Sequence, residues 1–177
     1  FSDVDSGIIF TMNENYAAYA IRLMLAVGRK MLGQVYNNGS GGMGLLANPI
    51  PAGDTGWHHF AMLHNGSGTC TVFLDGVLQA QNTSCSPIVN ATSPMAIGKP
   101  AGYGGYQTSP VSLGGIRYSK VVRYPDGTTF TPASSWPVDS NTIAQYLTQQ
   151  GLGATLVDEA GGDNTGTLYG GGIPETP

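Results

Sequence analysis

All three histidines of the chain lie in one short segment, TGWHHFAMLHNGSGTCTVFLDGVLQAQ, residues 55–81. A histidine beside a carboxylate and a hydroxyl could act as a general base. The alternation of side chains over residues 57–64 instead predicts a β-strand, with Trp57 and His59 in the row that packs inward. We therefore expect His59 to be half-buried and bonded to the backbone. Trp57 and Phe60 are expected to supply buried apolar area.

Carboxylate pairs that could hydrolyse glycosidic bonds are not indicated. Such enzymes need two carboxyl groups flanking the scissile bond. Glu14, Glu159 and Glu175 have no carboxylate partner at alternate strand positions, and the adjacent Asp158 and Glu159 would face opposite ways in a strand. The histidines share one predicted strand, which does not favour a Ser-His-Asp triad. The sequence therefore predicts a protein that is not an enzyme.

The two cysteines, Cys70 and Cys85, could form a disulfide or remain two buried thiols. A bridge would close a loop of about fifteen residues and contribute about 3 kcal/mol. Around a two-residue turn at Asp75-Gly76, Cys70 lies opposite Gln81, so a bridge requires the chain after Gln81 to fold back. Two cysteines without CxxC spacing do not indicate a zinc site.

The segment DEAGGDN, residues 158–164, offers oxygen donors on a glycine-rich backbone. Its Asp158, Asp163 and Asn164 suit Ca²⁺, with the two aspartates as the preferred ligands. The alternative is an ordinary turn stabilised by Asx side chains.

Four Asn-x-Ser/Thr sequons lie in turn-like contexts, where a surface glycan could be accommodated. We expect them to be used in a eukaryotic secreted protein and silent in a bacterial or phage protein. Their asparagines are Asn38, Asn65, Asn82 and Asn90.

Turn signals punctuate the chain and predict antiparallel strands. A type I′ turn is expected at Asp75-Gly76, within a meander of strands at residues 57–64, 69–74 and 77–81. Other turns are expected at residues 37–39, 41–42, 52–54 and 125–127. Other strands are expected at residues 7–11, 95–98, 111–118 and 152–157. This spacing is typical of a sandwich or barrel.

Two segments contain residues that favour helix. Residues 16–35 are rich in Ala, Leu and Met, but the alternation near residues 21–25 predicts two strands broken at Gly28-Arg29. At residues 141–150, Asp139 or Ser140 could cap a short helical turn.

Composition limits the class of protein. A chain of 177 residues suits a single domain over residues 1–177. Only 10% of the residues are charged and 27 are glycine, a bias common in extracellular and virion β-proteins. The net charge of −4 and scattered basic residues argue against nucleic-acid binding. The longest apolar run, residues 17–27, contains Arg22 and is too short to span a membrane.

Three stretches carry a resemblance to a known family. They are GWHHFAMLHNGSGTCTVFLDGVLQ, MAIGKPAG followed by VSLGGIRYSKVVRYPDGTTFTP, and NTIAQYLTQQGLGATLVDEAGGDNTGTLYGG. They resemble the laminin-G-like, concanavalin-A-like jelly rolls of phage and secreted bacterial proteins. The resemblance implies an all-β, two-sheet antiparallel jelly-roll sandwich with at most a short helical turn near residues 140–150. Gln145 and Thr148 depart from it, since apolar residues are expected there.

The resemblance also suggests functions. Many relatives bind glycans through aromatic platforms, for which Tyr103, Tyr106 and Trp136 are the candidates here. Relatives often hold calcium at a loop. The family usually begins with a strand before the point where this sequence starts, so we expect an edge strand here to be short, absent or supplied by another chain. The N-terminal strand, within residues 1–10, could in turn be donated to a neighbour.

An unpaired sheet edge is a template for another chain. We therefore expect a non-enzymatic structural module of the extracellular space or virion surface. It is expected to self-assemble into a homo-oligomer by strand addition, with a filament as one form. The alternative is a carbohydrate-binding or adhesion domain, for example of a phage tail protein.

Overall fold

The computed structural model describes residues 7–12, 21–37, 40–85, 95–97, 107–108, 112–124, 128–147 and 155–167. Every regular element within these ranges is a β-strand. No helix long and apolar enough to cross a membrane occurs among the residues so described. The chain groups into two compact units, Phe1–Pro110 with Tyr124–Pro132, and Val111–Arg123 with Ala133–Pro177.

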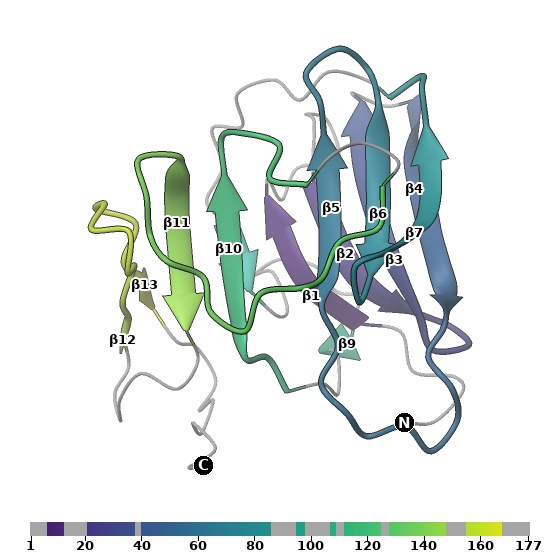
Figure 1. Cartoon of the computed structure of the whole chain (residues 1–177), viewed down its shortest axis with the longest axis horizontal. Coiled ribbons are helices and arrows are strands. Elements are labelled where there is room, and N and C mark those ends of the chain that lie inside the picture. The colour runs from purple at the N-terminus through teal and green to yellow at the C-terminus, as the bar shows by residue number, and fades with distance from the viewer. Residues whose placement is uncertain are drawn as a thin grey trace. The chain divides into compact units, whose positions relative to one another are not determined.

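The first unit is built from two sheets (Figure 1). The larger has the order β4-β3-β2-β1-β8, with β9 pairing parallel to β1. Its strands are β1 (Gly7–Met12), β2 (Ile21–Ala26), β3 (Lys30–Asn37), β4 (Ser40–Pro49), β8 (Met95–Ile97) and β9 (Gln107–Thr108). The smaller sheet has the order β5 (Phe60–His64), β6 (Cys70–Leu74) and β7 (Val77–Asn82), all antiparallel.

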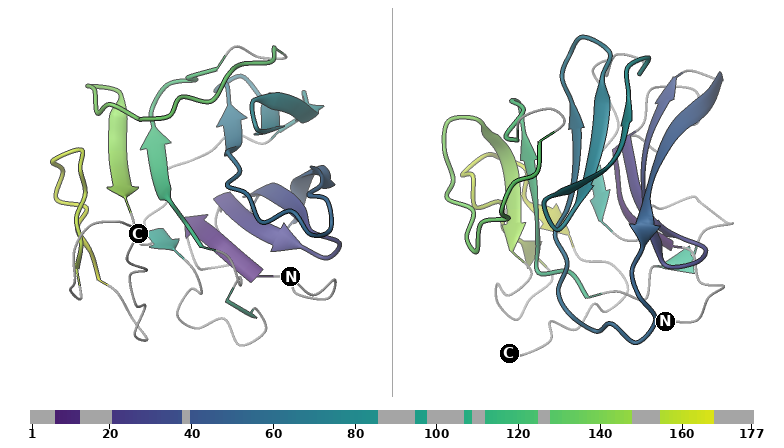
Figure 2. Two further views of the ribbon diagram at one scale, coloured as in Figure 1. Left: turned by 60° about the horizontal axis from the view of Figure 1, so that its bottom comes forward. Right: turned by 45° about the vertical axis from the view of Figure 1, so that its right-hand side comes forward.

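These two sheets face each other as the layers of a sandwich (Figure 2). Buried side chains of both fill the space between them, because alternate residues of each strand point to the same face. Val35 and Leu45 of the larger sheet cluster with Val72 of the smaller one. The layers come so close at Gly33 that a Cβ atom there would lie 2.8 Å from Met62 Sδ. The expected antiparallel β-sandwich is therefore confirmed.

Several expected turns and strands are present. The break at Gly28-Arg29 between β2 and β3 is confirmed, since both residues have positive φ, at 77° and 60°. The type I′ turn at Asp75-Gly76 is confirmed by φ values of 51° and 77°. The strand expected from residue 57 instead begins at Phe60. The turn expected at Gly41-Gly42 is wrong, because both residues lie inside β4, which pairs with β3.

A side-chain hydrogen bond, which we call the Gln79 clasp, links β4, an edge strand of the larger sheet, to β7, an edge strand of the smaller sheet. The backbone N–H of Asn48 in β4 donates to Gln79 Oε1 of β7 at 3.0 Å. The Gln79 Nε2 atom donates to the carbonyl of Val77 at 3.1 Å. Asn48 lies at a shift in the register of the β3–β4 pair, and Gln79 lies at a shift in the register of the β6–β7 pair. The bond therefore joins two irregular points of the strand edges. The clasp occupies backbone groups that could otherwise bind an added strand.

The first strand is an inner strand of its own sheet. Gly7–Met12 pairs with β2 on one side and with β8 and β9 on the other. Within one chain, the part of residues 1–10 that the structure describes therefore already has partners. Donation of this segment to a neighbour stays a prediction.

The second unit has two short antiparallel pairs. One joins β10 (Gly115–Ser119) to β11 (Thr142–Leu147), and the other joins β12 (Thr155–Leu156) to β13 (Gly166–Thr167). The helical turn allowed near residues 140–150 is wrong over residues 142–147, which form β11. Residues 148–150 lie outside the described part.

Local side-chain chemistry explains this correction. Asp139 Oδ1 accepts from the Asn141 N–H at 2.9 Å and from Thr142 Oγ1 at 3.1 Å. These bonds shape a turn that leads into β11 rather than a helix cap. Arg123 forms an ion pair with Asp139 at 2.6 Å, and its guanidinium holds the pKa of that carboxyl well below its usual range.

Candidate functional site

The loop that joins β4 to β5, residues 50–59, displays the most exposed large apolar side chain described. Trp57 is 72% exposed. This corrects the expectation that Trp57 packs inward. The alternating pattern extends to residues before Phe60, where the strand begins. Because Trp57 lies in the loop before the strand, the alternation does not predict which way its side chain points.

The same loop is anchored to the β2–β3 turn by hydrogen bonds. The Ile50 N–H donates to the carbonyl of Arg29 at 3.0 Å. The Arg29 guanidinium donates to the carbonyl of Asp54 at 3.1 Å. The loop also turns internally, with the Asp54 N–H donating to the carbonyl of Pro51 at 3.2 Å. These bonds limit the conformational freedom of the segment that precedes Trp57.

His58, next to the exposed tryptophan, lies between two aspartates. Its Nδ1 is 2.8 Å from Asp75 Oδ2, and its Nε2 is 3.5 Å from Asp54 Oδ1. The other Asp75 oxygen accepts the His59 N–H at 2.8 Å. Asp75 therefore ties both residues after Trp57 to the β6–β7 turn.

Electrostatics in this group follow from the hydrogen bonds. The bond to Asp75 raises the pKa of His58, and the charges of Asp75 and Asp54 add to that effect despite opposing desolvation. The Gly56 N–H, which donates to Asp54 Oδ1 at 2.9 Å, lowers the pKa of Asp54. We name Asp54, Trp57, His58 and Asp75 the tryptophan cluster. Trp57 is next to His58 in the chain, and His58 contacts both aspartates.

His59 is half-buried, as expected, among aromatic rings. Its ring meets Tyr124 and Phe130 edge-on, with centroids 5.8 and 5.7 Å away. Tyr124 stacks on Phe130 at 3.7 Å, and Phe130 also contacts Phe73. This packing gives His59 a structural role in the first unit.

The described contacts of the histidines do not form a nucleophilic triad. His58 forms its ion pairs with the carboxylates of Asp54 and Asp75, and His64 Nδ1 accepts the Gly66 N–H at 3.0 Å. A hydrolytic triad would require the histidine to contact a serine or cysteine nucleophile.

Of the three aromatic residues proposed for sugar stacking, the structure describes Trp136. Trp136 is half-buried in the second unit, where the Arg117 guanidinium carbon lies 5.4 Å from the centre of its ring. The carbonyl of Trp136 accepts from Gln145 Nε2 at 2.8 Å. Tyr103 and Tyr106 lie outside the described residues.

The predicted calcium ligands form a hydrogen-bonded loop. Asp158 is 4% exposed and accepts from the N–H groups of Gln145 and Ala160, each at 2.9 Å, and from Asn164 Nδ2 at 3.1 Å. Burial acts to raise the pKa of Asp158, but these donors together lower it. Asp163 is exposed. Calcium binding here stays a prediction; no group of three or more His, Cys, Asp or Glu side chains able to hold a metal occurs in the described part of the chain.

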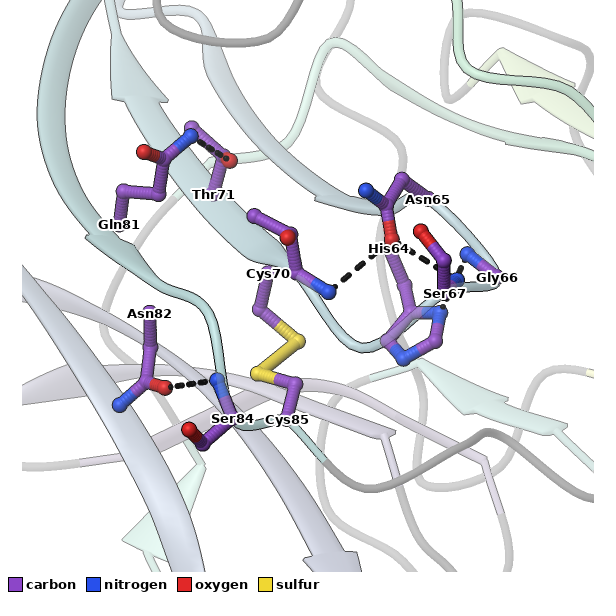
Figure 3. The surroundings of a disulfide bond; sticks show 11 residues. His64, Asn65, Gly66, Ser67, Cys70, Thr71, Gln81, Asn82, Ser84 and Cys85 are labelled. Atoms are coloured by element: carbon purple, nitrogen blue, oxygen red, sulfur yellow. Dashed lines mark hydrogen bonds between the residues drawn. A yellow bond between two sulfur atoms is a disulfide. The ribbon is translucent and has the colours of Figure 1, made fainter.

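The two cysteines are joined in a disulfide, with Cα atoms 5.8 Å apart (Figure 3). The chain folds back after β7, and the Cys85 N–H donates to the carbonyl of Gly68 at 2.7 Å. Two sequon asparagines lie beside this bridge. Asn82 Oδ1 accepts the Ser84 N–H at 2.7 Å, and Asn65 Oδ1 accepts the Ser67 N–H at 2.9 Å. Asn38 and Asn90 lie outside the described residues, and use of any sequon stays a prediction.

The first unit is therefore an antiparallel β-sandwich with an anchored loop that exposes Trp57. A laminin G-type family model, described as the concanavalin A-like lectin/glucanases superfamily, matches residues 2–117. The chain therefore belongs to this superfamily, which confirms the resemblance seen in the sequence. Membership suggests a carbohydrate-binding or adhesion-type module.

One solved structure is similar to part of the chain. It is an S-layer domain-containing protein (residues 221–444) from Clostridium thermocellum, at 17% identity and a TM-score of 0.30. The match covers 80% of this chain and 60% of the S-layer protein chain, so this chain spans less than two thirds of the length of that structure. No curated protein matches the chain significantly.

Proposed function

We propose that the chain is a non-catalytic carbohydrate-binding module and that Trp57 is its binding platform. The observation that carries the proposal is the 72% exposure of this ring in an anchored loop. Exposed apolar surface of this size favours contact with a ligand that has an apolar face. The C–H face of a pyranose ring has that property.

The polar members of the tryptophan cluster can bind the hydroxyl groups of the same sugar. The side chains of Asp54 and Asp75 are 34% and 48% exposed, so their carboxylates remain accessible to solvent. A hydrogen bond to His58 holds the Asp75 carboxylate, and the Gly56 N–H holds that of Asp54. Groups that are positioned before binding lose less conformational entropy when the ligand arrives.

An extracellular or cell-surface location is part of the proposal. The disulfide between Cys70 and Cys85 supports it, because such bridges persist in oxidising compartments. The low charge of the chain, with 10% charged residues, agrees with it. A virion surface, such as a phage tail, would satisfy the same requirements.

A glycan array tests the binding function. We expect wild-type protein to be retained on a subset of glycans, and Trp57→Ala to lose at least about tenfold in affinity, about 1.4 kcal/mol. Trp57→Phe should retain part of the binding, since a smaller aromatic face remains. Val121→Ala, which changes an exposed apolar residue of the second unit, is the matched control and should bind as wild type. Retention of Trp57→Ala equal to wild type would overturn the proposal.

Self-assembly through a sheet edge is the second candidate. The observation that favours it is the position of β4, a ten-residue strand at the end of the larger sheet. Strand addition there would form a homo-oligomer, and repetition head to tail would form a filament. The Gln79 clasp limits the available edge at Asn48.

Size-exclusion chromatography with negative-stain imaging separates the two candidates. Polymers of wild type that dissociate in Leu46→Lys, a change at an exposed β4 side chain, would support assembly. Monomers at every concentration would contradict it and leave the binding function standing.

A further inference from the structure

The turn between β5 and β6 holds an Asn-Gly pair in a specific hydrogen-bonded arrangement (Figure 3). The Gly66 N–H donates to His64 Nδ1 at 3.0 Å. Asn65 Oδ1 accepts two backbone N–H groups, from Ser67 at 2.9 Å and from Thr69 at 3.0 Å. The Gly66 nitrogen is therefore in contact with an imidazole nitrogen, and the Asn65 side-chain oxygen is in contact with two backbone N–H donors.

An asparagine followed by glycine can modify itself, because the glycine nitrogen can attack the asparagine side-chain amide without steric hindrance. The attack requires three things. A base must accept the proton of the attacking nitrogen, the amide oxygen must carry developing negative charge, and ammonia must leave. General bases and backbone N–H groups supply the first two in enzyme active sites.

We propose that Asn65-Gly66 is a self-modification site that His64 promotes. The Gly66 nitrogen forms a bond to Asn65 Cγ while its proton passes to His64 Nδ1. The N–H groups of Ser67 and Thr69 stabilise the charge on Asn65 Oδ1 in the tetrahedral intermediate. The Cγ–Nδ2 bond then breaks, and His64 returns the proton so that ammonia leaves and a succinimide ring remains. Water opens either carbonyl of the ring and gives aspartate or isoaspartate.

The turn is well placed for this role because the surrounding framework holds it. The Asn65 N–H donates to the carbonyl of Thr69 at 3.0 Å, and the disulfide at Cys70 follows directly. The product carries an added negative charge at the turn. An isoaspartate product also inserts an extra backbone atom, which changes the local turn.

Asn65 is also the asparagine of a sequon, and glycosylation and self-modification exclude each other at this residue. A glycan on Asn65 Nδ2 would occupy the leaving group, and conversion to aspartate would destroy the sequon. The test therefore uses protein made without glycosylation.

Asn38-Gly39 supplies a control inside the chain, because it is also an Asn-Gly-Ser sequence. Folded protein is incubated at mildly basic pH, and both sites are followed by peptide mapping with fragmentation that distinguishes isoaspartate. His64→Gln should slow the loss of Asn65 by about tenfold or more, because a general base is removed. The rate at Asn38 should not change. Equal rates at Asn65 in wild type and His64→Gln would overturn the proposal.

A second comparison does not depend on any variant. The rate at Asn65 is measured in the folded protein and in the reduced, denatured chain, where the His64 and backbone contacts are lost. We expect the folded protein to lose Asn65 severalfold faster than the denatured chain. If the folded protein is slower, the hydrogen bonds protect the amide and the proposal is wrong.

Discussion

At the scale of single residues, Gly76 shows how a turn is fixed by its surroundings as well as by its own conformation. Its φ of 77° is costly for any side chain with a branched Cβ. A Cβ atom there would also clash with the carbonyl oxygen of Phe130, the residue whose N–H donates to the carbonyl of Gly76. The residue must therefore satisfy both a conformational and a steric requirement.

Gly28 has the conformational requirement without the steric one. It has the same φ of 77°, but a Cβ atom there would meet nothing within 4 Å. We expect Gly28→Val to lower the free energy of unfolding by about 1–3 kcal/mol through strain alone. Gly76→Val should cost at least about 1 kcal/mol more, because the Phe130 backbone must move. Chemical denaturation measures both, and equal losses would contradict the close contact.

His58 gives the fold a dependence on pH. Its pKa is raised by the hydrogen bond to Asp75, so its contribution to stability is full below the ordinary histidine value of 6.5. That contribution is lost as the pH rises through the folded pKa. We expect His58→Gln to destabilise the protein more in acid than in base, by up to about 1 kcal/mol, since the pair is partly exposed.

The control for this prediction is Asp75→Asn. Asn-Gly retains the preference for a type I′ turn, while the negative charge beside His58 is removed. This variant should lose the same pH dependence in denaturation titrations. A wild-type profile retained in either variant would contradict the proposed origin of the effect.

Sequence reasoning predicted some of these residues and missed others. The Asp75-Gly76 turn was predictable, because its positive φ values follow from residue type. The exposure of Trp57 was not, because side-chain alternation cannot show that the strand begins only at Phe60. The contact of His58 with Asp75 depends on the β4–β5 loop meeting the β6–β7 turn in space, whereas Asp54 lies four residues before His58 in the same loop. An Asp-x-x-x-His spacing was the one local signal that could have been noticed.

At the scale of elements, β4 and β11 show where local patterns fail. Glycines in residues 41–44 suggest a turn, yet β4 runs through them because it pairs with β3. In β11, consecutive residues 144–146 are all buried, so no alternation is visible. Gln145 is accommodated there by its bonds to Asp158 and Trp136. Tertiary contacts override local preference at both strands.

The disulfide is the element-scale feature with the clearest energetic consequence. It links residues 15 apart in sequence. We expect the double variant Cys70→Ser, Cys85→Ser to lose about 3 kcal/mol of unfolding free energy, with strand content retained by circular dichroism. Wild type in reducing agent should lose a similar amount. A change below about 1 kcal/mol in both would show that the bridge adds little constraint.

At the scale of the whole molecule, the sequence was most informative about class. Regular turn signals and low charge predicted an all-β protein, and the three resembling stretches predicted its superfamily. The fold hosts many functions, so the specific one must be argued from a site. In this chain the argument rests on the tryptophan cluster, which belongs to the first unit.

The most direct test of this central claim is the fluorescence of Trp57 in a Trp136→Phe variant, where it is the sole tryptophan. Acrylamide quenching should first show a strongly exposed ring, in keeping with its 72% exposure. Addition of a glycan retained on the array should then shift the emission to the blue and reduce quenching, because the sugar covers the ring. A bound glycan that leaves both signals unchanged would contradict the account.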